Sequence, residues 1–371
     1  MNNVQKQFSP NSLVFDIAVI GGGVIGLSIA YALSKSKKRI VVLEKNIIGG
    51  EASWAAAGML RPVAESSHPE FLSLCLASKS LYPEFIRQLE SETGIDIEYT
   101  TSGGILLAFS EEEMNDLTEK YYLSRRNNID ARLLSPQEVL ILEPSVSPRI
   151  LGGLSMPTDH HLNNRKLCDA LKKALLLRNV ELIEQCMVKG FIEKESLICI
   201  STSLGSLHAQ NVIDCVGSWS SSLLPEFPVK PIRGQMVRMR GKLFNHVLSR
   251  HPFYLVPRKD GTIIIGSTVE DVGFSKEVTD EGMKFLVEGA QEMVPALKEC
   301  EIIEKWAGLR PLSVDQIPII GKVKEGVYIA TGHYRNGILL TPITAKIMHD
   351  IILGEKETEL FSPLRFYERY H

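Results

Sequence analysis

The 371-residue sequence contains no apolar stretch of about 20 residues, the length that a membrane-spanning helix needs. Its most apolar segment, Ile17 to Leu33, is shorter and is interrupted by glycines. Lysine and arginine form no dense block, and the net charge of -3 argues against nucleic acid or a membrane surface as a partner. The first dozen residues show no signal-peptide pattern, so we expect residues 1–11 to be a loose tail.

The sequence also lacks paired cysteines and a metal-binding pattern. Its 6 cysteines are scattered and form no C-x-x-C motif, which favours free thiols in a reducing, cytoplasmic location. His160 and His161 are adjacent, so their side chains point in different directions, and no histidine four residues away or nearby acid pair completes a site. We therefore predict no metal ion.

The stretch from Val14 to Glu44 has the pattern of a dinucleotide-binding unit. A short apolar strand stops at Gly21, and Gly21, Gly23 and Gly26 form G-x-G-x-x-G before apolar residues at helical spacing. These glycines permit a tight turn, close approach of a pyrophosphate and close packing of helix on strand. A second buried strand ends on Glu44, an acidic residue suited to a ribose diol. The stretch predicts a Rossmann unit that binds ADP.

Small residues follow this unit in unusual number, from Ile47 to Leu60. They allow the backbone to approach a large flat group, and we expect Ser53 to cap the short helix that follows. Near the other end, a glycine-rich turn, Gly332 to Gly337, leads into an apolar helix predicted from Ile338 to Leu353. Such a helix start stabilises an anion.

Length and the order of elements predict two domains. The length exceeds the usual size of one domain, and from Ile95, where we expect a strand to Tyr99, strands and helices no longer alternate. The fold class is α/β and α+β: a Rossmann-like domain with a central parallel sheet and a small β-meander, plus a mostly antiparallel substrate domain. We assign residues 12–90, 150–225 and 311–365 to the nucleotide-binding domain and 91–149 and 226–310 to the substrate-binding domain.

Five motifs give the chain a resemblance that runs nearly from end to end. They are I-G-G-G-V-I-G with its acid, G-G-E-A-S-W-A-A-A-G-M-L, Y-L-V-P-R (Tyr254 to Arg258), W-A-G-L-R-P and G-H-Y-R-N-G-I-L-L. The last two, at this separation, are the most specific. With them the chain resembles the D-amino-acid oxidase family of flavoproteins, and in particular its glycine oxidase branch.

The resemblance implies non-covalent FAD, a homotetramer, and amino-acid substrate and molecular oxygen as small-molecule partners. The implied reaction is oxidative deamination of glycine, sarcosine and small D-amino acids by hydride transfer from the α-carbon to flavin N5, with formation of an oxo acid and hydrogen peroxide. It also implies a role in the synthesis of the thiazole of thiamine. The chemistry agrees, because a guanidinium holds a carboxylate at two points and so orients the α-carbon.

The resemblance assigns substrate contacts to Arg310 in W-A-G-L-R-P, Tyr254 in Y-L-V-P-R, and Arg335 in G-H-Y-R-N-G. The structural alternative is two surface ion pairs and a half-buried tyrosine. Motif and resemblance together predict the following cofactor-binding residues: Gly21, Gly23, Val24, Ile25, Gly26, Glu44, Lys45, Ser53, Ala56, Ala57, Gly58, Met59, Val188, Gly217, Trp219, Gly308, Arg310, His333, Arg335, Asn336, Gly337, Ile338 and Leu339.

Three other functions remain open from the residues. An FAD-dependent D-amino acid or sarcosine-type dehydrogenase would pass electrons to an acceptor other than oxygen. A non-catalytic nucleotide-binding subunit would need no substrate clamp, and an NAD-dependent dehydrogenase would be colourless. A further hypothesis concerns Arg61, where a small residue is common in relatives. A cation there, near the mouth of the site, would favour substrates that carry a second anion; the alternative is an exposed arginine that only aids solubility.

Overall fold

The apolar strands at the start of the chain form the centre of a mainly parallel sheet. The computed structural model describes residues 14–63, 69–354 and 360–366. Strands buried on both faces have continuous apolar sequences, as in this sheet. Its order is β17 (Ile319–Lys324), β18 (Val327–Thr331), β11 (Gly205–Asp214), β1 (Val14–Ile20), β2 (Ile40–Leu43) and β8 (Glu181–Ile183); in addition β10 (Leu197–Thr202) pairs with β11, and β9 (Val188–Lys194) pairs with β10.

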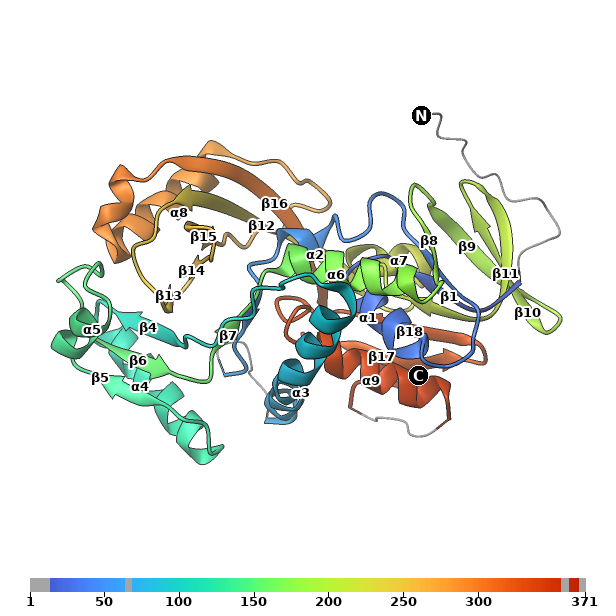
Figure 1. Cartoon of the computed structure of the whole chain (residues 1–371), viewed down its shortest axis with the longest axis horizontal. Coiled ribbons are helices and arrows are strands. Elements are labelled where there is room, and N and C mark those ends of the chain that lie inside the picture. The colour runs from blue at the N-terminus through green and yellow to red at the C-terminus, as the bar shows by residue number, and fades with distance from the viewer. Residues whose placement is uncertain (1–13, 64–68, 355–359, 367–371) are drawn as a thin grey trace.

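Helices cover one face of this first sheet, and the β9–β10–β11 meander packs over the opposite face (Figure 1). The helices are α1 (Val24–Leu33), α3 (Pro69–Thr93), α6 (Asn164–Leu177) and α9 (Thr341–Ile352). Their apolar stripes share one core with β1 and β2, while a second core lies beneath the meander. This is the expected Rossmann-like arrangement with a small meander.

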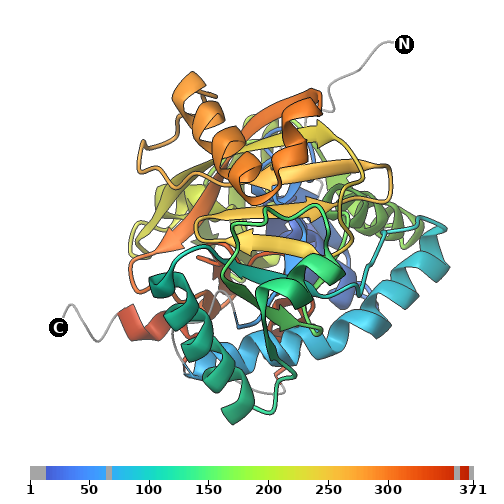
Figure 2. The same cartoon turned by 90° about the vertical axis from the view of Figure 1, so that its left-hand side faces the viewer.

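The second sheet is antiparallel except for β13 and β4, which run parallel. Helix α8 packs against β12, β14 and β15, and α4 against β4 and β6; Figure 2 faces this side of the molecule. The strand order is β16 (Ile302–Ser313), β12 (Val229–Arg240), β15 (Thr262–Gly266), β14 (Phe253–Pro257), β13 (Val247–Arg250), β4 (Gly104–Ala108), β6 (Gly152–Met156) and β5 (Arg132–Leu134). Its helices are α4 (Glu111–Arg126), α5 (Pro136–Leu142), α8 (Asp280–Met293) and the 3-10 turn η2 (Pro295–Glu299).

Short elements join the two parts. These are α2 (Ala52–Ala55), the strand pair β3 (Met59–Leu60) and β7 (His160–His161), η1 (Gly217–Trp219) and α7 (Ser220–Leu223), whereas η3 (Pro363–Phe366) packs against β17 of the first sheet. Two expectations about local structure were wrong. Residues 95–99 form no strand, and only Thr100 makes a bridge, with His161. Helix α9 begins at Thr341 rather than at Ile338, because residues 338–340 form a turn.

We propose the two-domain division that the sequence predicts, with two shifts of its boundaries. Strand β6 pairs with β4 and β5, so its residues group with the second sheet, although we had placed 150–225 in the nucleotide-binding domain. Strand β16 likewise continues past residue 310, to Ser313. The predicted tail, residues 1–11, lies outside the described residues. Among the described helices, none combines the length and the apolar character needed to cross a membrane.

Candidate active site

The turn from β1 into α1 is shaped by glycines that have no room for a side chain. Gly21 has a φ of +106°, and a Cβ there would lie 2.4 Å from the carbonyl oxygen of Cys215. A Cβ on Gly26 would lie 2.1 Å from the carbonyl oxygen of Gly21, so this glycine brings the helix onto the turn. Among the described residues, the N–H groups of Gly23 and Ile25 have no hydrogen-bond acceptor, which leaves them available to a phosphate.

The acid at the end of β2 supports the same turn. One Glu44 carboxylate oxygen accepts a hydrogen bond from the Gly22 N–H (2.8 Å) and the other accepts from the Asn46 N–H (2.9 Å). Burial raises the pKa of this carboxyl above its usual value. Ser53 was expected to cap its own helix; instead it lies inside α2 and its hydroxyl accepts from the Val24 N–H (2.8 Å). The Ser53 side chain therefore caps α1.

One cavity of about 680 Å³ runs from this turn to the second sheet. Among the predicted residues, the cavity does not include Gly26 or Leu339: Gly26 packs against the turn and Leu339 is in the apolar core. The predicted residues that line it are Gly21, Gly23, Val24, Ile25, Glu44, Lys45, Ser53, Ala56, Ala57, Gly58, Met59, Val188, Gly217, Trp219, Tyr254, Gly308, Arg310, His333, Arg335, Asn336, Gly337 and Ile338.

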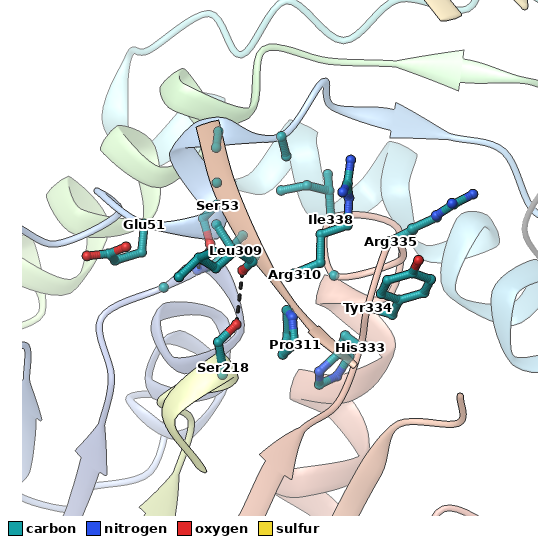
Figure 3. A pocket seen from close by; sticks show the side chains of 18 of the residues that line it. Glu51, Ser53, Ser218, Leu309, Arg310, Pro311, His333, Tyr334, Arg335 and Ile338 are labelled. Atoms are coloured by element: carbon teal, nitrogen blue, oxygen red, sulfur yellow. Dashed lines mark hydrogen bonds between the residues drawn. The ribbon is translucent and has the colours of Figure 1, made fainter. Parts of the chain in front are cut away.

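Arg310 projects from β16 into this cavity (Figure 3), and hydrogen bonds already hold its guanidinium. Nη1 donates to the carbonyl oxygens of Thr268 (3.2 Å) and Arg233 (3.3 Å), and Nη2 donates to the Ser267 hydroxyl (2.5 Å). The guanidinium occupies the space that a side chain at position 234 would need, since a Cβ on Gly234 would lie 2.2 Å from Nη1. Its direction is therefore set before any ligand binds.

Tyr254 reaches the cavity from β14, close to the segment that holds Arg310. Gly266 pairs with Tyr254 across the sheet, directly before Ser267. A Cβ on Gly266 would lie 2.5 Å from the phenol oxygen, so the glycine provides the space for this ring. The Tyr254 hydroxyl is 3.2 Å from Met236 Sδ, a weak acceptor that a carboxylate would readily replace.

Arg335 stands on the loop between β18 and α9, in a different setting. Its side chain is exposed, its guanidinium carbon lies 5.2 Å from the centre of the Tyr334 ring, and in Figure 3 it points away from Arg310. The neighbouring His333 is buried, with Nε2 3.1 Å from the Thr344 hydroxyl. Burial lowers the pKa of His333 to about 3, so this imidazole is neutral near pH 7.

The turn at residues 337–340, where the sequence predicted the start of a helix, still presents backbone N–H groups without an acceptor among the described residues. The carbonyl of Ile338 accepts from the Tyr82 hydroxyl, and that of Leu339 accepts from the Ser78 hydroxyl (2.6 Å), so both carbonyls face α3. Within the described part of the chain, the N–H groups of Gly337 and Ile338 have no acceptor, and both residues line the cavity. These amides favour an electron-rich group at this end.

Sequence reasoning missed Ser267, Gly234 and Met236, which no local motif marks. Arg61 lines the cavity, is only 5% exposed and has its Nε 2.8 Å from Asp159 Oδ2, which contradicts the alternative of a solubilising surface arginine, while its effect on substrates with a second anion stays a prediction. Arg61 is therefore half of a buried ion pair rather than an exposed cation. Among the described residues, no group of three or more acidic, histidine or cysteine side chains is arranged to hold a metal ion.

Comparison with known proteins agrees with this geometry. Residues 16–351 match the family model DAO, described as FAD dependent oxidoreductase. Glycine oxidase from Pseudomonas putida is 33% identical over 91% of this chain and 94% of its own length. The bifunctional protein ThiO/ThiG of Trichormus variabilis is 36% identical over 95% of this chain, which spans about half (54%) of that protein. Glycine oxidase from Geobacillus kaustophilus superposes with a TM-score of 0.92 at 31% identity, covering 95% of this chain and 99% of that one.

The cavity fits the cofactor of that family. Its glycine turn and the free amides of Gly23 and Ile25 suit the pyrophosphate, Glu44 ends the second strand where a ribose binds, and the Ala56–Met59 segment offers a wall of small residues. The amides of Gly337 and Ile338 suit an electron-rich ring edge. On the family match, the relatives and this fit, the chain belongs to the DAO family of FAD dependent oxidoreductases.

Proposed function

We propose that this protein is an FAD-dependent oxidase of glycine, sarcosine and small D-amino acids. Arg310 carries the proposal: its guanidinium faces the same cavity as the cofactor wall and is fixed by three acceptors. A planar, permanently charged group in this position suits a carboxylate, which it binds at two points. The resemblance to glycine oxidases at 31–33% identity supports the small amino acid as substrate.

The chain's part in the reaction is to bind and orient. Arg310 binds the substrate carboxylate, and the Tyr254 hydroxyl donates a second hydrogen bond to it. Holding the carboxylate at two sites fixes the direction of the α-carbon, which converts an encounter into an aligned reaction. Arg335, on the loop at the side of the cavity, supplies positive potential along the approach of the anion. An amine that enters neutral needs no general base from the protein.

The cofactor-facing residues complete the site. We assign the pyrophosphate to the Gly21–Gly26 turn, the ribose to Glu44, the adenine to the strand at Val188, and the flavin ring to the Ala56–Met59 segment. Bound FAD supplies the acceptor for the α-hydride and the route of electrons to oxygen. The amides of Gly337 and Ile338 stabilise negative charge at the edge of the ring system.

Three further properties are proposed with the activity. Formation of the thiazole of thiamine is supported by the resemblance to ThiO/ThiG. A cytoplasmic location is supported by six free cysteines. Assembly into a homotetramer is supported only by the family resemblance.

The test combines a visible spectrum with a peroxide assay on glycine, sarcosine, D-alanine and D-proline. We expect flavin absorbance in the purified protein and peroxide from glycine and sarcosine. Flavin that bleaches with substrate while no peroxide forms would refute the oxidase and indicate a dehydrogenase. Protein without flavin that also fails to bind added FAD would refute the family-based function altogether.

A further inference from the structure

Arg258 is a buried cation that has no role in the proposed reaction. It ends the Y-L-V-P-R motif and directly follows β14. Its side chain is 8% exposed and lies behind the cavity wall rather than in it. Nη1 donates to the carbonyl oxygen of Leu162 (2.6 Å), and Nη2 donates to the carbonyl oxygen of Ala57 (2.9 Å) and to Asn164 Oδ1 (3.2 Å).

None of these three acceptors is a carboxylate, so Arg258 donates its hydrogen bonds to dipoles and forms no ion pair with them. Burial lowers its pKa to about 10, with Arg238 and Arg165 adding repulsion and Glu98 and Asp260 opposing it. The guanidinium is therefore charged at neutral pH. Burying a cation without an ionic partner is costly, and a neutral side chain could fill the same volume. This cost suggests that the charge has a use.

The acceptors of Arg258 identify what it holds. Ala57 and Gly58 line the cofactor cavity, whereas Arg258 and Leu162 do not, so the 57–58 backbone separates the cation from the cavity. The Gly58 carbonyl accepts from the Leu162 N–H (2.9 Å) on the same side. Gly58 has a φ of +71°, and a Cβ there would lie 2.1 Å from the Leu162 carbonyl oxygen, so the segment fits closely against β7 and its neighbours.

A trans peptide group is planar, with its N–H opposite to its C=O. Because the Ala57 carbonyl points to Arg258, the Gly58 N–H points away from Arg258, toward the cavity. Within the described residues this N–H has no acceptor. A carbonyl that accepts from a cation also makes the N–H of the same peptide a stronger donor, since bonds in such a chain polarise one another.

We propose that Arg258 is a positioning residue that turns the Ala57–Gly58 peptide so that the Gly58 N–H donates to bound FAD, and that its charge favours the electron-rich, reduced form of the cofactor. The proposal rests on the FAD site and not on the identity of the amine substrate. The two ends of the Y-L-V-P-R motif then have different functions. Tyr254, its first residue, binds the substrate, and Arg258, its last, positions a peptide group that contacts the cofactor.

The test compares Arg258→Met, which removes charge and donors, with Arg258→Lys, which keeps the charge but cannot span three acceptors. Arg178→Met is the matched control: Arg178 bonds Glu92 (2.7 Å) and the Tyr31 carbonyl (3.2 Å) and does not line the cavity. The readouts are the Kd of apoprotein for FAD, the reduction potential of the bound FAD, and the Tm of the apoprotein.

For Arg258→Met we expect FAD to bind about tenfold more weakly, the scale of a lost hydrogen bond to a charged group. We also expect the potential to fall by about 30 mV, equivalent to a tenfold loss of preference for the two-electron reduced form. Arg258→Lys should lose affinity but keep a potential close to that of the wild type. Arg178→Met should change the Tm alone.

Wild-type Kd and potential in Arg258→Met would overturn the proposal, as would an equal loss of FAD affinity in Arg178→Met. If Arg258→Met does not fold, Arg258→Lys decides: weaker FAD binding at unchanged potential supports the proposal, and wild-type binding overturns it. Wild-type protein that binds FAD but produces no peroxide would refute only the proposed oxidase activity, because this test does not use turnover.

Discussion

Arg310 and Arg335 line the same cavity but are held in different ways. Arg310 stands on a strand, half-buried, with two nitrogens bonded to three acceptors. Arg335 stands on a loop, exposed, beside the Tyr334 ring. A cation whose direction is fixed in advance loses little freedom when the substrate binds, whereas an exposed cation is screened by water and salt. We therefore expect orientation of the substrate to depend on Arg310 and attraction of the anion to depend on Arg335.

The largest effect is expected for Arg310→Met. Removing one member of a desolvated charge pair costs about 2–5 kcal/mol, so kcat/KM for glycine should fall by roughly 30- to 5,000-fold. Steady-state kinetics with the FAD spectrum as a control for folding measure this. A fall of less than tenfold would mean that Arg310 does not bind the carboxylate.

Gly234→Ala should come next, because the new Cβ would lie 2.2 Å from Arg310 Nη1 and must displace the guanidinium. A misplacement of about 1 Å at a reacting site costs about 100-fold in rate. Gly190→Ala is the matched control, since a Cβ at that position meets nothing within 4 Å. Comparable kinetics in the two variants would show that the position of the guanidinium does not matter.

Ser267→Ala should have a smaller effect, since it removes one of three acceptors from Arg310 and leaves the charge in place. We expect KM for glycine to rise by about three- to tenfold, the range of an ordinary single hydrogen bond, because Arg310 keeps its other two acceptors, with kcat nearly unchanged. Ser275→Ala is the control, because Ser275 accepts from Arg233 rather than from Arg310. An equal rise in KM in both variants argues against the anchoring role of Ser267.

Arg335→Met should have the smallest effect, about threefold or less in kcat/KM, as for other exposed charges. The loss should be seen at low salt and disappear at roughly 0.5 M salt, where charges more than a few ångströms apart are screened. Measuring kcat/KM across salt concentrations checks this. A loss as large as that of Arg310→Met, independent of salt, would mean that Arg335 swings inward to bind the substrate.

The same contrast shows what the sequence alone can predict. The glycine turn and Glu44 are predictable because strand, turn and helix are consecutive and each glycine has a local reason. Arg310 and Tyr254 were found by resemblance to a family, because nothing around them distinguishes a clamp from a surface residue. The segment 95–99 was less predictable: it has the composition of a strand but packs into the core of the first sheet without a strand partner, and only the next residue, Thr100, makes a bridge.

Contacts that depend on the pairing of strands far apart in the chain could not be predicted from the sequence. Gly234 and Ser267 meet Arg310 only because β12 pairs with both β15 and β16. Arg61 has an ordinary sequence context, and its burial depends on Asp159, almost 100 positions away. No periodicity or motif in the sequence predicts these side-chain contacts, because they depend on which strands become neighbours in the fold.

The strand order of the first sheet has a consequence for how the protein is made. Strand β1 pairs with β2 on one side, but its other neighbour, β11, is about 200 residues further along the chain. A ribosome that adds about 5–20 residues per second needs roughly 10–40 s to deliver that partner. During this interval the glycine turn lacks Cys215, against which it packs, and the apolar edge of β1 is uncovered. We therefore expect efficient production of the enzyme to depend on protection of its nascent chain during that interval.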